Sequence, residues 1–154
     1  MPTEIERKYL VKNLDFLKEL KPKRIIQGYI AKSLKASLRI RIIEDKGFIT
    51  IKGNRKGISR PEYEYEIPYY HAKELLENFA GDSVIEKDRY KITFAGRVFE
   101  VDVFYRENEG LVIAEVELDS EKDKIELPEW IGREVSRDTR YYNSHLIKNP
   151  YCNW

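Results

Sequence analysis

The first two thirds of the chain alternate apolar and charged side chains with a period of two. This pattern is typical of β-strands whose two faces meet different surroundings. Short links that contain Gly or Asp, such as Glu44–Gly47 and Gly53–Gly57, separate several of these runs and favour hairpins. Strands are predicted at eight places: Thr3–Val11, Arg24–Ala31, Ser37–Ile43, Phe48–Lys52, Pro61–Ile67, Val84–Thr93, Val98–Phe104 and Leu111–Leu118.

Helical signals are few and lie between or after these strands. Side-chain caps, a first-turn proline and apolar spacing predict them. Helices are expected at three places: Leu14–Leu20 capped by Asn13, Tyr69–Phe79 after Pro68, and a last one from a cap at Asp138 to about Lys148. Many short strands with short connections predict a mainly β (α+β) fold, in which an antiparallel sheet closes on itself as one domain over residues 1–154.

The first strand places three charged side chains on one face. Successive side chains point to opposite faces, so Glu4, Glu6 and Lys8 lie together. Two carboxylates this close repel unless water, a cation or a basic neighbour screens them. Hard oxygen ligands beside a lysine suit a divalent metal that carries phosphate. From this segment alone, an ordinary solvated strand face is the favoured interpretation, and the metal site depends on whether other strands repeat the pattern.

Pairs of like charges recur at the same period on later strands. Examples are Arg39/Arg41, Lys87/Arg89 and Glu115/Glu117. A face selected only for solubility would mix the signs within each strand. Such neighbours are unfavourable unless something of opposite charge lies between them, so an anionic ligand would suit the bases and a metal cation the acids. The alternative is an outward charged face over an apolar sandwich core, because periodicity does not say which side is the inside.

Composition limits where this chemistry takes place. The 28 basic and 27 acidic residues nearly cancel, so no global field favours a nucleic acid or an anionic membrane as partner. No apolar run approaches the roughly 20 residues of a membrane helix, and no signal-peptide pattern is found. The single Cys152 cannot form an internal disulfide, and neither His71 nor His145 has zinc-ligand spacing. We therefore expect a cytoplasmic protein.

Further motifs follow the charged opening along nearly the whole chain. They are Gln27-Gly28-Tyr29, Leu38–Arg41, Thr50-Ile51-Lys52, Arg60–Glu64, Glu86–Tyr90, Glu100–Val103, Glu115-Val116-Glu117 and Arg140–Asn143. Together with Glu4-x-Glu6-x-Lys8, this ordered series resembles the CYTH superfamily, also called triphosphate tunnel metalloenzymes, and looks closest to its compact bacterial tripolyphosphatases. The resemblance implies a closed eight-stranded antiparallel barrel, with a few peripheral helices, whose hydrophilic tunnel holds a triphosphate.

The resemblance also implies roles for individual residues. The side chains that would bind phosphate in the tunnel are Lys8, Arg39, Arg41, Lys52, Lys87 and Arg89. The carboxylates that would hold Mg²⁺ or Mn²⁺ are Glu4, Glu6, Glu115 and Glu117. Glu62, Glu64 and Asp102 would hold a second metal or orient the attacking water and the basic side chains. Lys8 and Tyr29 would pair near the reacting phosphate as the catalytic residues.

The implied activity is metal-dependent hydrolysis of the terminal phosphoanhydride of inorganic tripolyphosphate, with nucleoside triphosphates as further substrates. A class IV-type adenylate cyclase, a thiamine triphosphatase and a non-enzymatic polyphosphate-binding module are the alternatives. The Ile30–Ala36 connection gives no evidence of an adenine pocket, and Tyr63, Tyr65 and Tyr90 fall on the face opposite the charged row. The expected partner is a small-molecule triphosphate, without nucleic acid or membrane, and the oligomeric state stays open, a homodimer included.

Overall fold

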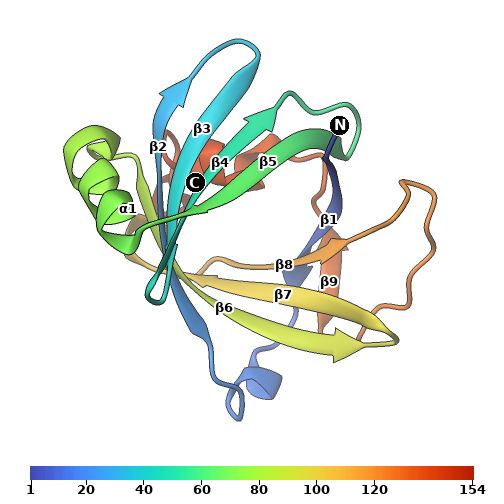
Figure 1. The fold of residues 1–154 in the computed structure, drawn as a ribbon. Helices are drawn as coiled ribbons and strands as arrows, with labels where there is room; N and C mark the ends of the chain where they lie inside the picture. The colour runs from blue at the N-terminus through green and yellow to red at the C-terminus, as the bar shows by residue number, and fades with distance from the viewer.

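The computed structural model describes residues 1–154 as a barrel of antiparallel strands with short helices around it (Figure 1). All eight predicted strands are present, with ends that differ from the prediction by at most two residues. The strands are β1 Thr3–Val11, β2 Lys23–Lys32, β3 Ala36–Ile43, β4 Lys46–Gly53, β5 Ser59–Ile67, β6 Val84–Phe94, β7 Arg97–Phe104, β8 Val112–Glu117 and β9 Ile131–Glu134.

Strand β1 closes the barrel. The strands follow the order β5-β4-β3-β2-β6-β7-β8-β1, and the start of β1, Thr3–Ile5, pairs antiparallel with β5. The predicted closed antiparallel barrel is therefore confirmed. Strand β9 was not predicted, and it pairs with β1 at Tyr9 and Val11, on the stretch that β5 leaves free. Its four residues are too short to show a clear alternation.

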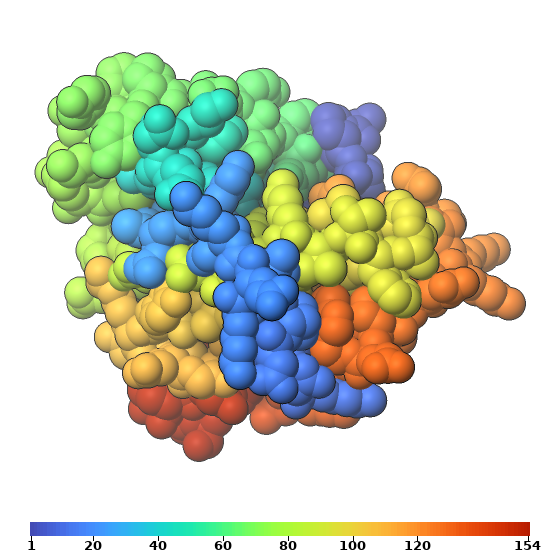
Figure 2. Space-filling view, turned by 90° about the horizontal axis from the view of Figure 1, so that it is seen from below, coloured from blue at the N-terminus to red at the C-terminus, as the bar shows by residue number.

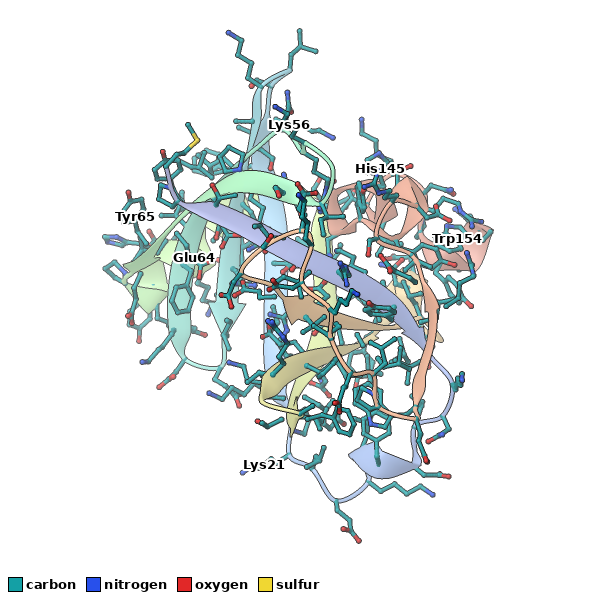
Figure 3. All side chains as sticks on the ribbon, turned by 90° about the vertical axis from the view of Figure 1, so that its right-hand side faces the viewer. Lys21, Lys56, Glu64, Tyr65, His145 and Trp154 are labelled. Carbon is teal, nitrogen blue, oxygen red and sulfur yellow. The ribbon has the colours of Figure 1, made fainter.

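The register between strands places the charged row inside the barrel. Residues directly opposite on neighbouring strands share a face, and Lys8 lies opposite Glu115 while Arg89 lies opposite Asp102. Figure 3 shows the alternation on β5, with Tyr65 at the outer edge and Glu64 further in. The apolar residues of the same strands face outward, so a charged face over a sandwich core is not the architecture of this chain.

Two clusters of apolar side chains lie on the outside of the barrel wall. One cluster joins β3 to helix α1, Tyr69–Leu75, and to its continuation Leu76–Ala80: it contains Ile40, Ile42, Ala72, Leu76 and Ala80. The other lies where β9 and the turn after β1 cover the wall: it contains Tyr9, Leu17, Ile58, Phe99, Val101, Ala114, Val116, Leu118 and Ile131. Burial of these outer faces supplies the hydrophobic stabilisation that a charged interior does not.

A third apolar cluster fills one end of the barrel interior. Ile113 lies opposite both Leu10 and Asp102, which places it on the inner face. The C-terminal segment supplies Tyr141 and Leu146 to this cluster: its members are Ile85, Phe104, Leu111, Ile113, Val135, Tyr141 and Leu146. The C-terminal residues therefore close one end of the barrel and border its charged part.

The helix predictions were only partly right. Helix α1 begins after Pro68 as expected, continues as a wide π-helical turn over Leu76–Ala80, and ends at Gly81, whose φ is +56°. In place of the helix expected over Leu14–Leu20 there is a single 3-10 turn, Asp15–Leu17, and Asn13 does not cap it. So short a segment forms a helix only when tertiary packing stabilises it, and Leu17 is its one buried residue.

The last predicted helix is also broken. Asp138 does accept a hydrogen bond from the Arg140 N–H, but it caps only a 3-10 turn over Thr139–Tyr141. Tyr142 then takes an extended conformation, with φ −74° and ψ 133°, before the one-turn helix α2, Asn143–Leu146. Two further 3-10 turns lie at Arg106–Asn108 and Tyr151–Asn153.

The segment between β1 and β2 and the C-terminal residues both lie on the outside of the molecule (Figure 2). From below, the segment that links β1 to β2 (blue) runs across the middle of the face, and the C-terminal residues (red) lie at its lower left edge (Figure 2). None of the helices has the length and apolar character needed to cross a membrane.

Close packing of α1 on β4 requires a glycine at position 47. A Cβ atom on Gly47 would lie 2.6 Å from the Ala72 Cβ and 3.2 Å from the Ile67 carbonyl oxygen. We predict that Gly47→Ala lowers the free energy of unfolding by about 1–3 kcal/mol, as overpacking does, in urea denaturation. The matched control is the double variant that combines Gly47→Ala with Ala72→Gly. Its loss in the free energy of unfolding should be smaller than the sum of the losses in the two single variants, and strict additivity would contradict this close contact.

Candidate active site

The barrel encloses a hydrophilic cavity. Its volume is about 640 Å³, and of the 28 residues that line it only five are hydrophobic. This size suits a small-molecule ligand. Every site residue predicted from the sequence lines the cavity except Asp102, which lies behind the surface. The predicted residues that line the cavity therefore come together, although they are spread over seven strands of the barrel.

Lysines separate the carboxylates at one side of the cavity. Glu4 and Glu6 lie on β1, and Glu115 and Glu117 lie on the adjacent β8. The Lys8 ammonium Nζ lies 3.2 Å from Glu115 Oε1 and 3.8 Å from Glu6 Oε1. Lys52 Nζ is 2.9 Å from Glu4 Oε2. The basic neighbours needed to screen these acids thus come from within the barrel.

This screening is incomplete at Glu6. Burial and the neighbouring carboxylates of Glu115 and Glu4 raise the pKa of Glu6 to about 8. Burial also acts to raise the pKa of Glu4, but the Lys52 ammonium outweighs it and brings that pKa down to about 2. The cluster therefore has more carboxylates than its two lysines neutralise, and an additional cation would stabilise its fully ionised form.

The donor atoms of this cluster fit a hard divalent cation. All four candidate ligands, Glu4, Glu6, Glu115 and Glu117, offer carboxylate oxygens, which Mg²⁺ and Mn²⁺ prefer. No three of these carboxylates converge in a ready-made ligand cluster. Binding of a cation would therefore require rotation of these side chains away from Lys8 and Lys52.

Two arginines on β3 face the cavity with a carboxylate between them. Glu64 Oε2 lies 2.9 Å from Arg41 Nη2 and 3.7 Å from Arg39 Nη2, and Thr50 donates a 2.7 Å hydrogen bond to the same oxygen. The Nε atoms of Arg39 and Arg41 are buried and have no acceptor. Burial and the nearby Arg39 charge lower the pKa of Arg41 to about 10. Glu64 thus neutralises part of this pair and leaves donors for an anion.

Asp102 lies behind the cavity surface and pairs with Lys87 and Arg89. Its side chain is fully buried, with Oδ2 2.7 Å from Lys87 Nζ and Oδ1 2.7 Å from Arg89 Nε. Arg89 also contacts Glu100 at 3.1 Å. Burial lowers the pKa of Lys87 to about 8 in spite of the Asp102 carboxylate. Of the two roles expected for Asp102, its position fits orientation of basic side chains and does not fit a metal ligand in the cavity.

The expected pairing of Tyr29 with Lys8 is not found. Both side chains line the cavity, but no hydrogen bond joins them. The aromatic ring beside the Lys8 ammonium is that of Tyr142, with its centroid 5.7 Å from Nζ. Tyr29 instead lies opposite Arg39 in the register of β2 and β3. Both predicted catalytic side chains therefore face the same cavity, and their pairing near a bound phosphate stays a prediction.

Several lining residues were not predicted. Lys91 and Glu100 follow the alternation of their strands on the charged face but were given no site role, and Arg60 continues the same alternation on β5. Arg55 lies in the β4–β5 connection, and Tyr142, Asn143 and Ser144 belong to the C-terminal segment: no strand periodicity identifies these four. Asn143 Oδ1 accepts hydrogen bonds from Lys87 Nζ and Gln27 Nε2, each 3.1 Å long.

The tyrosines that were expected on the outer face are absent from the cavity wall. Tyr63, Tyr65 and Tyr90 do not line it, which confirms their predicted side of the strands. The aromatic side chains that do line it are Tyr29, Phe48 and Tyr142.

Comparisons with known proteins identify one family, and two relatives and one solved structure share a name. The model of the CYTH domain family matches residues 2–147. An inorganic triphosphatase of Acetivibrio thermocellus is 51% identical over 154 residues, which is 100% of this chain and 99% of that protein. An inorganic triphosphatase of Nitrosomonas europaea is 37% identical over 148 residues, or 94% of this chain and 96% of that one. The crystal structure of an inorganic triphosphatase aligns with a TM-score of 0.68 and 33% identity, covering 93% and 96% of the two chains.

The raised pKa of Glu6 makes the stability of the metal-free protein depend on pH. The pKa of Glu6 rises from 4.5 to about 8 on folding, so between these values the folded protein keeps a proton that the unfolded chain loses. The free energy of unfolding should therefore fall as pH rises through this window, by at most about 1.4 kcal/mol per pH unit. We predict that Glu6→Gln removes most of this slope in urea denaturation with a chelator present.

Glu4→Gln is the matched control on the same strand. The pKa of Glu4 is already low, about 2, so its own titration lies below this window. The variant removes only one of the charges that raise the pKa of Glu6, while burial and Glu115 remain, so it should keep most of the slope of the wild type. Parallel pH profiles for wild type and Glu6→Gln would contradict the raised pKa of Glu6.

Proposed function

The chain belongs to the CYTH domain family, and from this premise we propose that it is an inorganic triphosphatase, which hydrolyses the terminal phosphoanhydride bond of tripolyphosphate. The observation that most supports this function is the cavity itself. Buried arginine donors without acceptors face the same space as a cluster of carboxylates in excess over its lysines. A ligand that is a polyanion bound with a metal cation satisfies both sides at once.

Phosphoryl transfer needs positioning and charge neutralisation more than covalent chemistry. Arg39 and Arg41 offer planar forks to phosphate oxygens, and Lys8 and Lys87 offer point charges. Asp102 fixes the directions of Lys87 and Arg89, so these side chains lose little freedom when the substrate binds. A divalent cation held by Glu4, Glu6, Glu115 and Glu117 would add positive charge on the phosphate oxygens that these bases do not reach.

Glu62 is the best candidate to orient the attacking water. Its Oε2 is buried without a hydrogen-bond donor, although Lys52 Nζ lies 3.3 Å away. Burial raises the pKa of Glu62 above its usual value, although Lys52 acts against this, so the group is a better proton acceptor than an ordinary carboxylate. Glu64 is less suited, because Arg41 and Thr50 already occupy its Oε2.

Tripolyphosphate fits this cavity better than a nucleotide. Charged groups dominate the lining, and the outer tyrosines cannot stack on a base. A nucleoside would thus gain little binding energy while adding bulk, so the smaller and more highly charged anion is favoured. A cyclase or a thiamine triphosphatase would need a site for its organic group. A module that only binds polyphosphate would need no carboxylates facing its ligand.

A phosphate-release panel tests the proposal. Purified protein is assayed with tripolyphosphate, ATP, thiamine triphosphate and pyrophosphate, each with Mg²⁺, Mn²⁺ or excess chelator. We predict the highest kcat/KM for tripolyphosphate, with orthophosphate and pyrophosphate as products, and no turnover in chelator. Pyrophosphate should be a poor substrate, because it does not reach all the bases that hold the non-reacting phosphates.

Other results of the panel would change the assignment. Cyclic AMP formed from ATP would identify a cyclase, and preferred release of phosphate from thiamine triphosphate would identify a site for the organic group. Full tripolyphosphate turnover in excess chelator would contradict the metal role of the carboxylate cluster. Binding of tripolyphosphate without turnover under any of these conditions would leave a binding module.

A further inference from the structure

Arg55 reaches the cavity from the connection between β4 and β5. Its guanidinium carbon lies 4.1 Å from the centroid of the Tyr142 ring, so that the two groups stack. Its neighbour Lys56 is exposed and does not line the cavity, and it is labelled on the outside of the barrel in Figure 3. One residue of this connection therefore faces inward while the next faces solvent.

The charge of Arg55 has no carboxylate partner. Arg39, Arg41 and Arg89 each form an ion pair inside the barrel, whereas Arg55 forms none. The Nε atom of Arg55 is buried and has no hydrogen-bond acceptor. A buried donor left unpaired is costly, so such a group in a native structure requires an explanation, and a bound ligand that accepts from it is one.

Hydrogen bonds hold the residues on both sides of Arg55 in place. Asn54 Nδ2 donates a 2.8 Å hydrogen bond to the Leu34 carbonyl, and the Ile58 N–H donates to Glu121 Oε1 at 3.1 Å. The Ile58 side chain is buried in the outer apolar core. With both flanks held and the guanidinium stacked on Tyr142, the direction of Arg55 is set before any ligand arrives, which lowers the entropy cost of binding.

We propose that Arg55 is a further substrate-binding residue, which donates hydrogen bonds to an end phosphate of an inorganic polyphosphate chain, and that Tyr142 positions it. The inference rests on the proposed function and adds one contact to it. A guanidinium stacked on an aromatic ring keeps its edge N–H donors free, and the planar fork matches two phosphate oxygens. The contact also joins the β4–β5 connection to the C-terminal segment across the bound ligand.

The test is binding of tripolyphosphate without metal, measured by isothermal titration calorimetry in excess chelator. Arg55→Ala should weaken binding roughly ten- to hundredfold, the effect of losing a hydrogen bond to a charged group. Lys56→Ala is the matched control, with the same change of net charge in the same connection, and should bind like the wild type. Arg55→Lys should recover only part of the loss, because an ammonium lacks the fork.

Variants of Tyr142 test the positioning role. Tyr142→Phe keeps the ring and loses only the hydrogen bond from its hydroxyl to the Ser136 carbonyl, so it should bind like the wild type. Tyr142→Leu should weaken binding, and combining it with Arg55→Ala should add little further loss. Melting temperatures identify any variant that has lost its fold.

The outcomes separate this inference from the proposed function. If the wild type binds and hydrolyses tripolyphosphate and Arg55→Ala binds it equally well, the role of Arg55 is overturned and the proposed function stands. Equal losses for Arg55→Ala and Lys56→Ala would indicate a general charge effect and would also overturn it. If the folded wild type neither binds nor hydrolyses tripolyphosphate, both proposals fall.

Discussion

Compensation of buried charge is the constraint on which this structure depends. A charge moved out of water is stabilised only by a close partner of opposite sign or by hydrogen bonds. The fully buried Asp102 meets this requirement between Lys87 and Arg89, and Glu64 does so between two arginines. The acidic side chains of one strand pair with basic side chains on its neighbours. The carboxylates and the arginine N–H donors that remain without a partner define the ligand.

A charged interior determines where the apolar core lies. The outward faces of the strands must be covered, and α1, β9 and the turns after β1 and β8 cover them. These covering elements are short because each needs to bury only a small part of the wall, which explains why helix propensity predicted them poorly. The C-terminal segment has two functions: Leu146 packs in the apolar end of the barrel, while Asn143 contacts the ammonium of Lys87.

Period-two alternation predicted the strands and which side chains share a face, but it left open which face is the inside. The resemblance to the CYTH superfamily placed the charged face inside a closed barrel, and the alternation would have added Arg60 to the site had it been applied throughout. It could not find Arg55 or Tyr142, since their positions depend on how a connection and the C-terminal segment pack in three dimensions. The Tyr142 ring beside Lys8 is thus a neighbour that strand periodicity could not supply.

The central claim is that the interior charges act on the substrate and are not a solvated surface. The most direct test compares kcat/KM for tripolyphosphate in Arg41→Ala and in Lys73→Ala, an exposed lysine on α1. Each variant removes one positive charge. The structure predicts a loss of about 2–5 kcal/mol in transition-state stabilisation for Arg41→Ala and almost none for Lys73→Ala. Indistinguishable values for the two variants, both folded, would contradict the inward-facing charged cavity as the site of the reaction.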